Sequence, residues 1–208
     1  MKLYYYETLN PQKVCAVAKY LGSPVEYVRV DLAKRESKTP EFLAINPNGR
    51  VPALTDGPVR LWEADAIMAY LARAAGSELL PTDDRLIDVM RWLSWSANHF
   101  TRHAGNLYFQ YVIKANFLKQ DPDLNAVEEA TGFLRQFAAV LDDHLRGRKY
   151  LVGDGLTIAD FAVAVTLPYT KQARLPLEGL DGIARWHDRL CELPAWREPF
   201  PANPAAAA

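Results

Sequence analysis

Asn46-Pro47-Asn48-Gly49-Arg50-Val51-Pro52-Ala53-Leu54 is the stretch that decides the fold, because it places a turn directly before a short apolar run. Its prolines, glycine and asparagines are typical turn residues. Pro52 has no N–H, so it cannot pair as an interior strand residue, and the cis form is accessible to an X-Pro bond. We expect the N–H and C=O of Val51 to point outward, free to pair with an extended peptide. The alternative is an ordinary turn before an edge strand.

The composition is that of an ordinary globular protein. The chain has 208 residues, of which half are apolar and 24% are charged, with a net charge of -1. Without a basic excess, a nucleic-acid surface is not expected. No apolar run approaches the roughly 20 residues that span a membrane, and the N-terminus lacks the apolar segment of a signal peptide. The two cysteines, Cys15 and Cys191, are far apart, which indicates free thiols and a cytoplasmic location.

Strand and helix signals alternate over the first 77 residues. Asn10 and Pro11 predict a helix cap followed by proline in the first turn, and Gly22 ends that helix. Asp56-Gly57 between two short apolar runs predicts a hairpin. The predicted order is β-α-β-α-β-β-α, with strands at 3–6, 25–30, 53–55 and 59–62 and helices at 11–21, 39–43 and 63–75.

The polar segment at 78–85 predicts a linker, and the pattern from residue 86 onward is helical. Thr157 to Asp160 has the signature of a capping box, with Asp in place of the usual Glu. The helix that follows is apolar on all sides, so we expect it to be buried. The tail at 201–208 has too little apolar bulk to pack. The predicted helices are 86–117, 127–145, 158–166 and 180–193.

Helical spacing also predicts which residues face inward. The sets are Ala66, Ile67, Tyr70 and Leu71 in the helix that opens at Glu63; Val89, Leu93, Ala97, Phe100 and Ala104 in the first long helix; and Phe133, Leu134, Phe137, Val140 and Leu141 in the second. The fold class is therefore a small α/β domain followed by an all-α domain.

Three motifs resemble those of the glutathione S-transferase family, in the family's order. Residues 46–54 match its cis-proline segment, residues 63–67 (Glu-Ala-Asp-Ala-Ile) resemble its Glu-Ser-x-Ala-Ile motif, and residues 150–160 match the helix-capping motif of its second domain. The resemblance covers nearly the whole chain and is to the bacterial cytosolic type. It implies a thioredoxin-like glutathione-binding domain at 1–77, a linker at 78–85 and a helical-bundle domain at 86–208.

The same resemblance implies a cytoplasmic, homodimeric detoxification enzyme. Its co-substrate would be glutathione, it would need no metal, and it would have no nucleic-acid or membrane partner. The implied reaction is attack by the glutathione thiolate on a hydrophobic electrophile or a glutathione disulfide. A thiol with a pKa near 8.5 is mostly protonated at neutral pH, so a hydrogen-bond donor beside the sulfur must favour the thiolate.

The family's pattern before Lys13-Val14 places a hydroxyl donor at Thr8 and an amide donor at Asn10, while Leu9 replaces the usual proline. The simpler interpretations are a turn hydroxyl and a helix cap. Tyr5 is a third candidate donor, since other branches use a tyrosine on this strand, although strand tyrosines commonly serve packing. Cys15 fits a core residue better than a nucleophile that forms mixed disulfides.

The remaining glutathione contacts are also implied by the resemblance. Val51, held by Pro52, would pair its backbone with the cysteinyl part, and Glu63 would receive the γ-glutamyl ammonium. Lys38 or Arg50 would bind the glycyl carboxylate, unless either is only a solvated charge. Asp65 would reach across a dimer interface toward the same ammonium.

Ala64 is the main departure from the family, which usually has a serine there to bind the γ-glutamyl carboxylate. Alanine keeps the backbone N–H and the helix N-terminus but removes one hydrogen bond to a charged group, worth about 1.5–3 kcal/mol. Weakened glutathione binding is expected. The rival hypothesis is a non-catalytic binding module with the same fold, which Ala64 and Leu9 favour.

Aromatic and histidine residues crowd the first long helix, against which a second substrate would sit. They are Trp95, His99, Arg102, His103, Tyr108, Phe109 and Tyr111. Core or interface packing explains such spacing equally well. His99 and His103 have the i, i+4 spacing of metal ligands, but the sequence places no third ligand beside them, so no metal site is expected.

Overall fold

The computed structural model describes residues 1–202 as two compact units. The first contains residues 1–77 together with the described residues from Cys191 onward, and the second contains residues 78–190. The domain boundaries given above stay a prediction, to which the structure adds that the last helix, α9 (Pro194–Arg197), groups with the first unit. The tail expected at 201–208 lies mostly outside the described residues.

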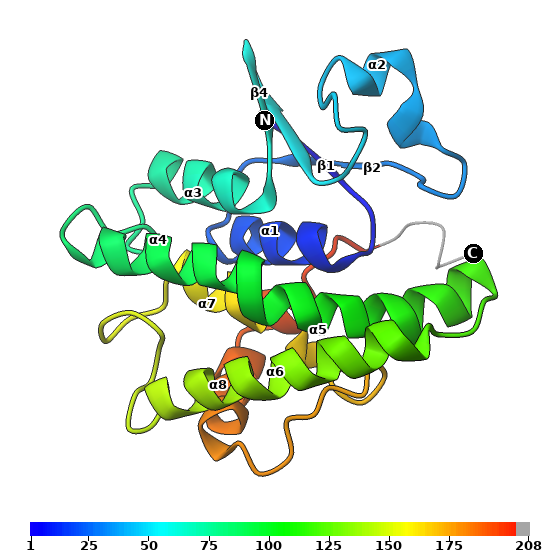
Figure 1. The fold of residues 1–208 in the computed structure, drawn as a ribbon. Coiled ribbons are helices and arrows are strands. Elements are labelled where there is room, and N and C mark those ends of the chain that lie inside the picture. The colour runs from blue at the N-terminus through cyan, green and yellow to red at the C-terminus, as the bar shows by residue number, and fades with distance from the viewer. Residues whose placement is uncertain (203–208) are drawn as a thin grey trace. The chain divides into compact units, whose positions relative to one another are not determined.

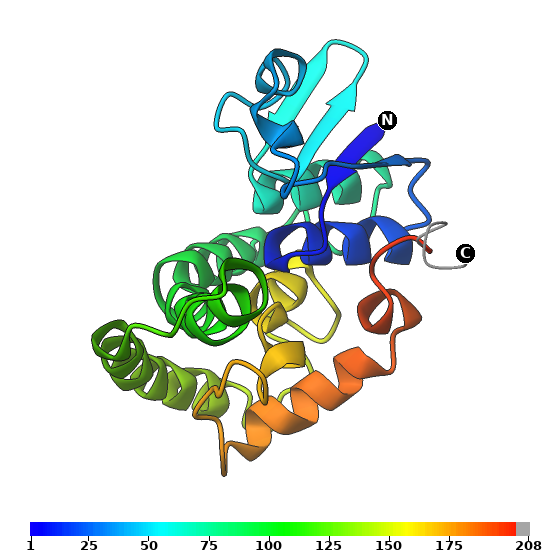
Figure 2. The ribbon, with the colours of Figure 1, turned by 90° about the vertical axis from the view of Figure 1, so that its right-hand side faces the viewer.

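The first unit has the predicted β-α-β-α-β-β-α order (Figure 1). Its strands are β1 (Lys2–Tyr5), β2 (Glu26–Arg29), β3 (Ala53–Asp56) and β4 (Val59–Trp62). They form one sheet in the order β2-β1-β3-β4, in which only the β1–β2 pair is parallel. Its larger helices, α1 (Leu9–Tyr20) and α3 (Ala64–Ala74), pack together beneath the sheet in Figure 2.

The other side of the sheet carries a short helical segment made of η1 (Glu36–Lys38) and α2 (Pro40–Leu43). Thr39 caps α2, because its hydroxyl accepts a hydrogen bond from the Phe42 N–H at 3.3 Å. Phe42 packs into a small cluster with Val30 and Ala53, and Tyr4 contacts it edge-on. This packing fixes the chain segment that leads into the turn at 46–50.

Two details of the first unit differ from the sequence prediction. Helix α1 begins at Leu9, so Thr8 is its N-cap residue and Asn10 lies inside the first turn. In α3 the buried stripe is Ala64, Ile67, Met68, Leu71 and Ala72. Ala66 is exposed, and Tyr70 turns its hydroxyl to the Asp56 carboxylate at 2.8 Å, so neither belongs to the inward face.

In the second unit, the first long helix is interrupted by π-helical turns. It runs through α4 (Arg85–Trp95), η2 (Ser96–Phe100), α5 (Thr101–Tyr108) and η3 (Phe109–Leu118). A π-turn bonds i to i+5 and therefore rotates the following residues relative to an α-helix. Ala97, which we predicted to face inward, lies in η2 and is exposed, whereas Ser96 before it and Phe100 after it are buried.

Helix α6 (Leu124–His144) lies beside this helix in Figure 1 and begins at Asp123, whose carboxylate accepts from the N–H groups of Asn125 and Ala126. Its buried stripe is made of small and aliphatic residues: Ala130, Leu134, Ala138 and Leu141. The prediction that Phe133 and Val140 face inward was wrong, because they are 44% and 50% exposed.

Helix α7 (Ile158–Ala164) is buried along its whole length, as its apolar pattern predicted. The predicted capping box is confirmed: the Asp160 carboxylate accepts from the Thr157 N–H at 2.9 Å and also from the Leu151 N–H at 3.0 Å and the Trp186 indole at 2.9 Å. Trp186 belongs to α8 (Asp181–Cys191), so one carboxylate joins three segments. A short turn, η4 (Leu167–Tyr169), follows α7.

None of the helices within residues 1–202 combines the length and the apolar character that crossing a membrane requires.

Candidate functional site

A pocket of about 230 Å³ opens in the first unit where the turn before β3 meets the first turns of α1 and α3. We call it the Val51 pocket. It brings together six of the predicted site residues with two asparagines that the prediction did not include. Its lining is Asn10, Asn46, Asn48, Arg50, Val51, Pro52, Glu63 and Ala64.

The side chain of Asn46 holds the turn together. Its amide donates to the Arg50 carbonyl at 2.7 Å, and its carbonyl oxygen accepts from the Asn48 N–H at 3.0 Å and from the Asn48 side-chain amide at 3.0 Å. Asn46 is only 3% exposed, so these bonds lie away from solvent. The sequence predicts only that Asn46 and Asn48 are turn residues, because asparagine composition alone does not distinguish a turn from a pocket wall.

Lys38 lies close to the same turn, although it does not line the pocket. Its ammonium donates to the Asn48 carbonyl at 3.3 Å. Gly49 permits this approach: it has a φ of +58°, and a Cβ at this position would lie 2.6 Å from the Lys38 Nζ and 2.8 Å from the Ser37 carbonyl oxygen. A glycine is therefore required at position 49, both because of the positive φ and because a side chain would collide with Lys38 and Ser37.

The backbone of Val51 stays unpaired beside the pocket. Within residues 1–202, no hydrogen bond occupies its N–H or its C=O. The Val51–Pro52 peptide bond is cis, and β3 begins after it at Ala53. A free donor and a free acceptor on one residue at the end of a strand can pair with an extended peptide.

Glu63 precedes α3 in an unusual conformation, with a φ of +71° and a ψ of 120°. In a residue other than glycine, such a backbone conformation costs about 1–3 kcal/mol, and residues with strained backbones are concentrated at functional sites. Its carboxylate is exposed, and no cation of the described chain forms an ion pair with it. The Glu63 carboxylate, which has no ion-pair partner among the described residues, is therefore available to an ammonium group of a ligand.

Next to the negative Glu63 carboxylate lies the N-terminus of α3, which is the positive end of the helix dipole. Ala64 is the first residue of this eleven-residue helix and is buried at the pocket wall. Free N–H groups and the helix dipole favour an anion at a helix N-terminus. An amino acid group with both charges matches this pair of neighbours.

Two acids near the pocket residues in sequence, Asp65 and Glu7, are neutralised within the chain. Asp65 accepts from the Lys13 ammonium at 2.6 Å, and the Lys13 side chain is only 7% exposed. Glu7 accepts two bonds from the Arg29 Nε, at 2.8 and 3.1 Å. Arg29 also lies 4.6 Å above the Tyr6 ring. The reach of Asp65 across a dimer interface stays a prediction, and here its carboxylate is bound by Lys13.

The three candidate thiolate donors have different surroundings. Asn10 lines the Val51 pocket. Thr8 occupies the N-cap position of α1, and no described residue forms a hydrogen bond with its hydroxyl. Tyr5 is 5% exposed and stacks on Phe200 at 5.9 Å. Burial, and next the Glu7 charge, raise the pKa of the Tyr5 phenol. Of the three, Asn10 lines the pocket, Thr8 precedes α1 outside the lining, and Tyr5 is packed in the core. The role of Thr8 and Asn10 as thiolate donors stays a prediction.

Cys15 is fully buried in α1. Burial, followed by the Glu7 charge, raises the pKa of its thiol to about 12. A thiol that stays protonated is a poor nucleophile, so Cys15 is a packing residue in this structure.

The aromatic residues of the first long helix do not form one wall. Trp95, His99 and His103 lie against Phe133 and Phe137 of α6, with ring centroids between 4.7 and 6.2 Å apart. Tyr108 is buried against Tyr169, and Tyr111 lies under the Arg174 guanidinium. In the part of the chain that the structure describes, no three acidic, histidine or cysteine side chains are grouped to hold a metal.

Comparison with known proteins gives matches for both units. A model of the glutathione S-transferase N-terminal domain matches residues 1–73, and a model of the C-terminal domain matches residues 125–189. Glutathione S-transferase 3 of Zea mays is 34% identical over 211 residues, covering 96% of this chain and 94% of that protein. This relative is a plant protein, not the bacterial type that the resemblance implied.

Solved structures agree with this match. Glutathione S-transferase-I bound with lactoylglutathione has a TM-score of 0.85 at 30% identity, covering 95% of this chain and 97% of that chain. A family member from Pseudomonas fluorescens with two glutathione bound has a TM-score of 0.84 at 26% identity, covering 95% of this chain and 91% of that chain.

Replacing Gly49 by alanine should destabilise the protein more than replacing Gly22. Both glycines have a positive φ, so alanine strains each backbone by about 1–2 kcal/mol. Only at Gly49 would the new Cβ also collide with neighbours, whereas Gly22 has nothing within 4 Å. We expect an additional loss of about 1–3 kcal/mol for Gly49→Ala in chemical denaturation. Equal losses in the two variants would contradict the close approach of Lys38 and Ser37.

Proposed function

The chain belongs to the glutathione S-transferase family, and from this premise we propose that it is an enzyme that activates the glutathione thiolate. The thiolate attacks a hydrophobic electrophile or a glutathione disulfide. The observation that carries the proposal is the unpaired Val51 backbone in a pocket that also holds Glu63 and the N-terminus of α3. These groups match the peptide, ammonium and carboxylate parts of glutathione.

Each contact follows from the chemistry of the pocket. The Val51 N–H and C=O pair with the cysteinyl residue of glutathione, and Pro52 fixes the end of the strand behind it. The Glu63 carboxylate accepts the γ-glutamyl ammonium, and the Ala64 N–H donates to the γ-glutamyl carboxylate. Lys38 and Arg50 are the cations within reach of the turn and bind the glycyl carboxylate.

The donor to the sulfur is Thr8 or Asn10. Lowering the thiol pKa by one unit requires about 1.4 kcal/mol of preference for the thiolate. One hydrogen bond to a charged acceptor can supply this amount. The unoccupied Thr8 hydroxyl and the position of Asn10 in the pocket support both residues, and the N-terminus of α1 adds a favourable dipole.

The thiolate can react in two balanced ways. With an electrophile, the new S–C bond forms as the leaving group departs with its electron pair. With a mixed disulfide, the thiolate attacks one sulfur, glutathione disulfide forms, and the other thiolate is released. The second reaction is supported by the Pseudomonas fluorescens relative, whose structure contains two glutathione molecules.

Ala64 supports a second candidate, a binding module without catalysis. Its side chain offers no hydroxyl to the γ-glutamyl carboxylate, so glutathione would bind weakly. The intact Val51 backbone, Glu63, Thr8 and Asn10 favour the enzyme. A cytoplasmic location and a role in detoxification are part of the enzyme proposal.

We also propose a homodimer. Trp95, His99 and His103 together with Phe133, Phe137 and Val140 form a continuous surface, which we call the aromatic face. Phe133 and Val140 are among its exposed members. A contiguous exposed apolar surface of this kind commonly marks a protein interface.

The catalytic proposal is tested by activity and by the pKa of bound glutathione. We expect turnover with an aromatic halide or with a mixed glutathione disulfide. Removing the sulfur's donor, by Thr8→Val or Asn10→Ala, should raise the pKa of the bound thiol by about one unit. The pH dependence of thiolate absorbance measures this pKa.

Tyr5→Phe is the control, because the Tyr5 phenol is packed in the core and should leave this pKa unchanged. A shift with Tyr5→Phe alone would make Tyr5 the donor. No turnover in either assay would favour the binding module if glutathione still binds.

Ala64→Ser should tighten glutathione binding by about ten- to a hundredfold, because it restores one hydrogen bond to a charged group. Titration calorimetry measures the affinity. Ala66→Ser is the matched control, since Ala66 lies in the same helical turn but is exposed. Equal affinities of the two variants would show that the γ-glutamyl carboxylate does not lie at position 64.

Val140→Glu should weaken the dimer at least tenfold, because it places a charge within an apolar interface. Sedimentation velocity over a concentration series gives the dissociation constant. Leu124→Glu is the control: Leu124 is also exposed, but it lies at the far end of α6 from Val140. The proposal is wrong if the unmodified protein is monomeric or if both variants behave alike.

A further inference from the structure

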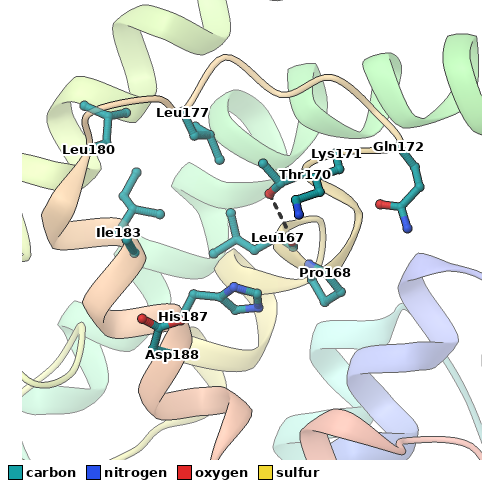
Figure 3. A pocket seen from close by; sticks show the side chains of 11 residues that line it. Leu167, Pro168, Thr170, Lys171, Gln172, Leu177, Leu180, Ile183, His187 and Asp188 are labelled. Carbon is teal, nitrogen blue, oxygen red and sulfur yellow. Dashed lines mark hydrogen bonds between the residues drawn. The ribbon is translucent and has the colours of Figure 1, made fainter.

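A pocket of about 560 Å³ in the second unit has balanced charges (Figure 3). The cation Lys171 and the acid Asp188 both line it, and it shares no residue with the Val51 pocket. One charge of each sign favours neither an anion nor a cation as a ligand. The start of α1 in the first unit is arranged differently, because there an acid directly precedes the N-terminus of a helix.

This acid is Glu7, which lies next to Thr8, the N-cap residue of α1. Thr8 and Asn10, the two proposed donors to the glutathione sulfur, both follow it at the start of this helix. Because consecutive Cα atoms are only about 3.8 Å apart, the Glu7 charge lies close to a sulfur that is bound there. A negative charge disfavours a neighbouring thiolate, so Glu7 alone would oppose the activation of glutathione.

Groups of the chain that become anions near Glu7 already show this effect. Next to burial, the Glu7 charge is the main cause that raises the pKa of the Tyr5 phenol and of the Cys15 thiol. Cys15 lies in the second turn of α1, so the charge acts on the helix that carries both donors. Arg29 has the opposite effect, because its charge lowers the pKa of Tyr5 and so offsets part of the effect of Glu7.

The sheet places Arg29 beside Glu7. Arg29 is the β2 partner of Tyr5, the last residue of β1, so its side chain reaches the segment that connects β1 to α1. Its Nε donates to both carboxylate oxygens of Glu7, at 2.8 and 3.1 Å. The guanidinium also lies 4.6 Å from the centre of the Tyr6 ring, a cation–π contact that holds it over the residue before Glu7.

Arg29 is the cation that is paired with Glu7 among the residues that the structure describes. Other charged groups of the first unit are engaged in pairs of their own. They are Asp31 with Lys34 at 3.8 Å and Asp65 with Lys13 at 2.6 Å. Asp31 also lies 3.8 Å from the Arg29 guanidinium, farther than Glu7 does. Glu63 and Arg50, the charged residues that line the Val51 pocket, would be paired with groups of glutathione in the proposed complex.

We propose that Arg29 is a positioning residue for the reaction, which neutralises Glu7 and thereby keeps the start of α1 favourable to the glutathione thiolate. Its effect on the sulfur passes through Glu7, and it needs no contact with glutathione or with the second substrate. This inference rests on the proposed function, because it concerns the thiol that Thr8 or Asn10 would contact.

Replacing Arg29 by methionine should raise the pKa of the bound glutathione thiol by about 0.5 unit, because the Glu7 charge is then unopposed. The pH dependence of thiolate absorbance at saturating glutathione measures this pKa. Arg29→Lys keeps the charge and should leave the pKa close to that of the unmodified protein. The pair is partly exposed, so its loss should leave the fold intact.

Variants of Glu7 separate the charge from a structural effect. Glu7→Gln should lower the thiol pKa, since the Arg29 cation is then unopposed, and the double variant Glu7→Gln/Arg29→Met should return it to the unmodified value. The shift in Arg29→Met should also shrink in about 0.5 M salt, which screens exposed charges. Arg73→Met is the matched control, because it removes an exposed arginine in the last turn of α3, far from Ala64 at its start.

The proposal is overturned if Arg29→Met leaves the thiol pKa unchanged, if the double variant keeps the raised pKa, or if Arg73→Met shifts it equally. Should Arg29→Met fail to fold, an unchanged or raised thiol pKa in Glu7→Gln overturns it instead. If the unmodified protein binds no glutathione, or binds it without lowering its thiol pKa, the transferase proposal fails as well. Normal activation that does not respond to Arg29 overturns the role of Arg29 alone.

Discussion

The hydrogen bonds of the buried Asn46 side chain are the constraint on which the Val51 pocket depends. A chain reversal leaves backbone N–H and C=O groups that must find partners when they are buried. Asn46 supplies two of these partners within the turn, at the Asn48 N–H and the Arg50 carbonyl. Because the turn is satisfied by a side chain, the next residue, Val51, does not have to close it. Its N–H and C=O stay available to a ligand.

Ion pairs within the chain determine which acidic side chain near this pocket is available to a ligand. Two acids near the pocket residues in sequence, Glu7 and Asp65, are each bound to a cation of the chain, Arg29 and Lys13 respectively. Glu63 is the acid that lines the pocket, and no described residue forms an ion pair with it. Its positive φ holds this carboxylate beside the start of α3, where the next residue offers an N–H to an anion. An ammonium and a carboxylate on the same carbon of a ligand would therefore have adjacent partners, the Glu63 carboxylate and the N–H of the next residue.

Local signals in the sequence predicted much of the fold. The hairpin around Gly57 and the capping box at Thr157–Asp160 were predictable, because each depends on residues close together in the chain. The asparagine-proline pair predicts a cap at Asn10 and a helix from Pro11, but the helix starts two residues earlier, at Leu9, with Thr8 as its N-cap residue. In the first long helix, Phe100 and Ala104 are buried as predicted, whereas Ala97 is exposed because the π-turn of η2 changes the helical period there.

Exposed apolar residues were the other source of error. Helical spacing grouped Phe133 and Val140 with Leu134 and Leu141, and periodicity alone cannot tell a buried apolar residue from an exposed one. Likewise, the sequence named most residues of the Val51 pocket through motif resemblance, but not Asn46 and Asn48. Their role comes from side-chain hydrogen bonds that composition does not encode.

The effect of Ala64 can be judged from the contacts that remain. In the glutathione complex that we propose, two neutral hydrogen bonds to Val51 would contribute about 0.5–1.5 kcal/mol each, and charged contacts at Glu63 and at Lys38 or Arg50 would contribute about 1.5–3 kcal/mol each. The missing serine hydroxyl removes one contact of the second kind. Since more than one such contact is left, and the α3 N-terminus still favours the anion, the substitution weakens the site without removing its basis for binding glutathione. A family member with alanine at this position can therefore keep catalysis while it requires a higher glutathione concentration.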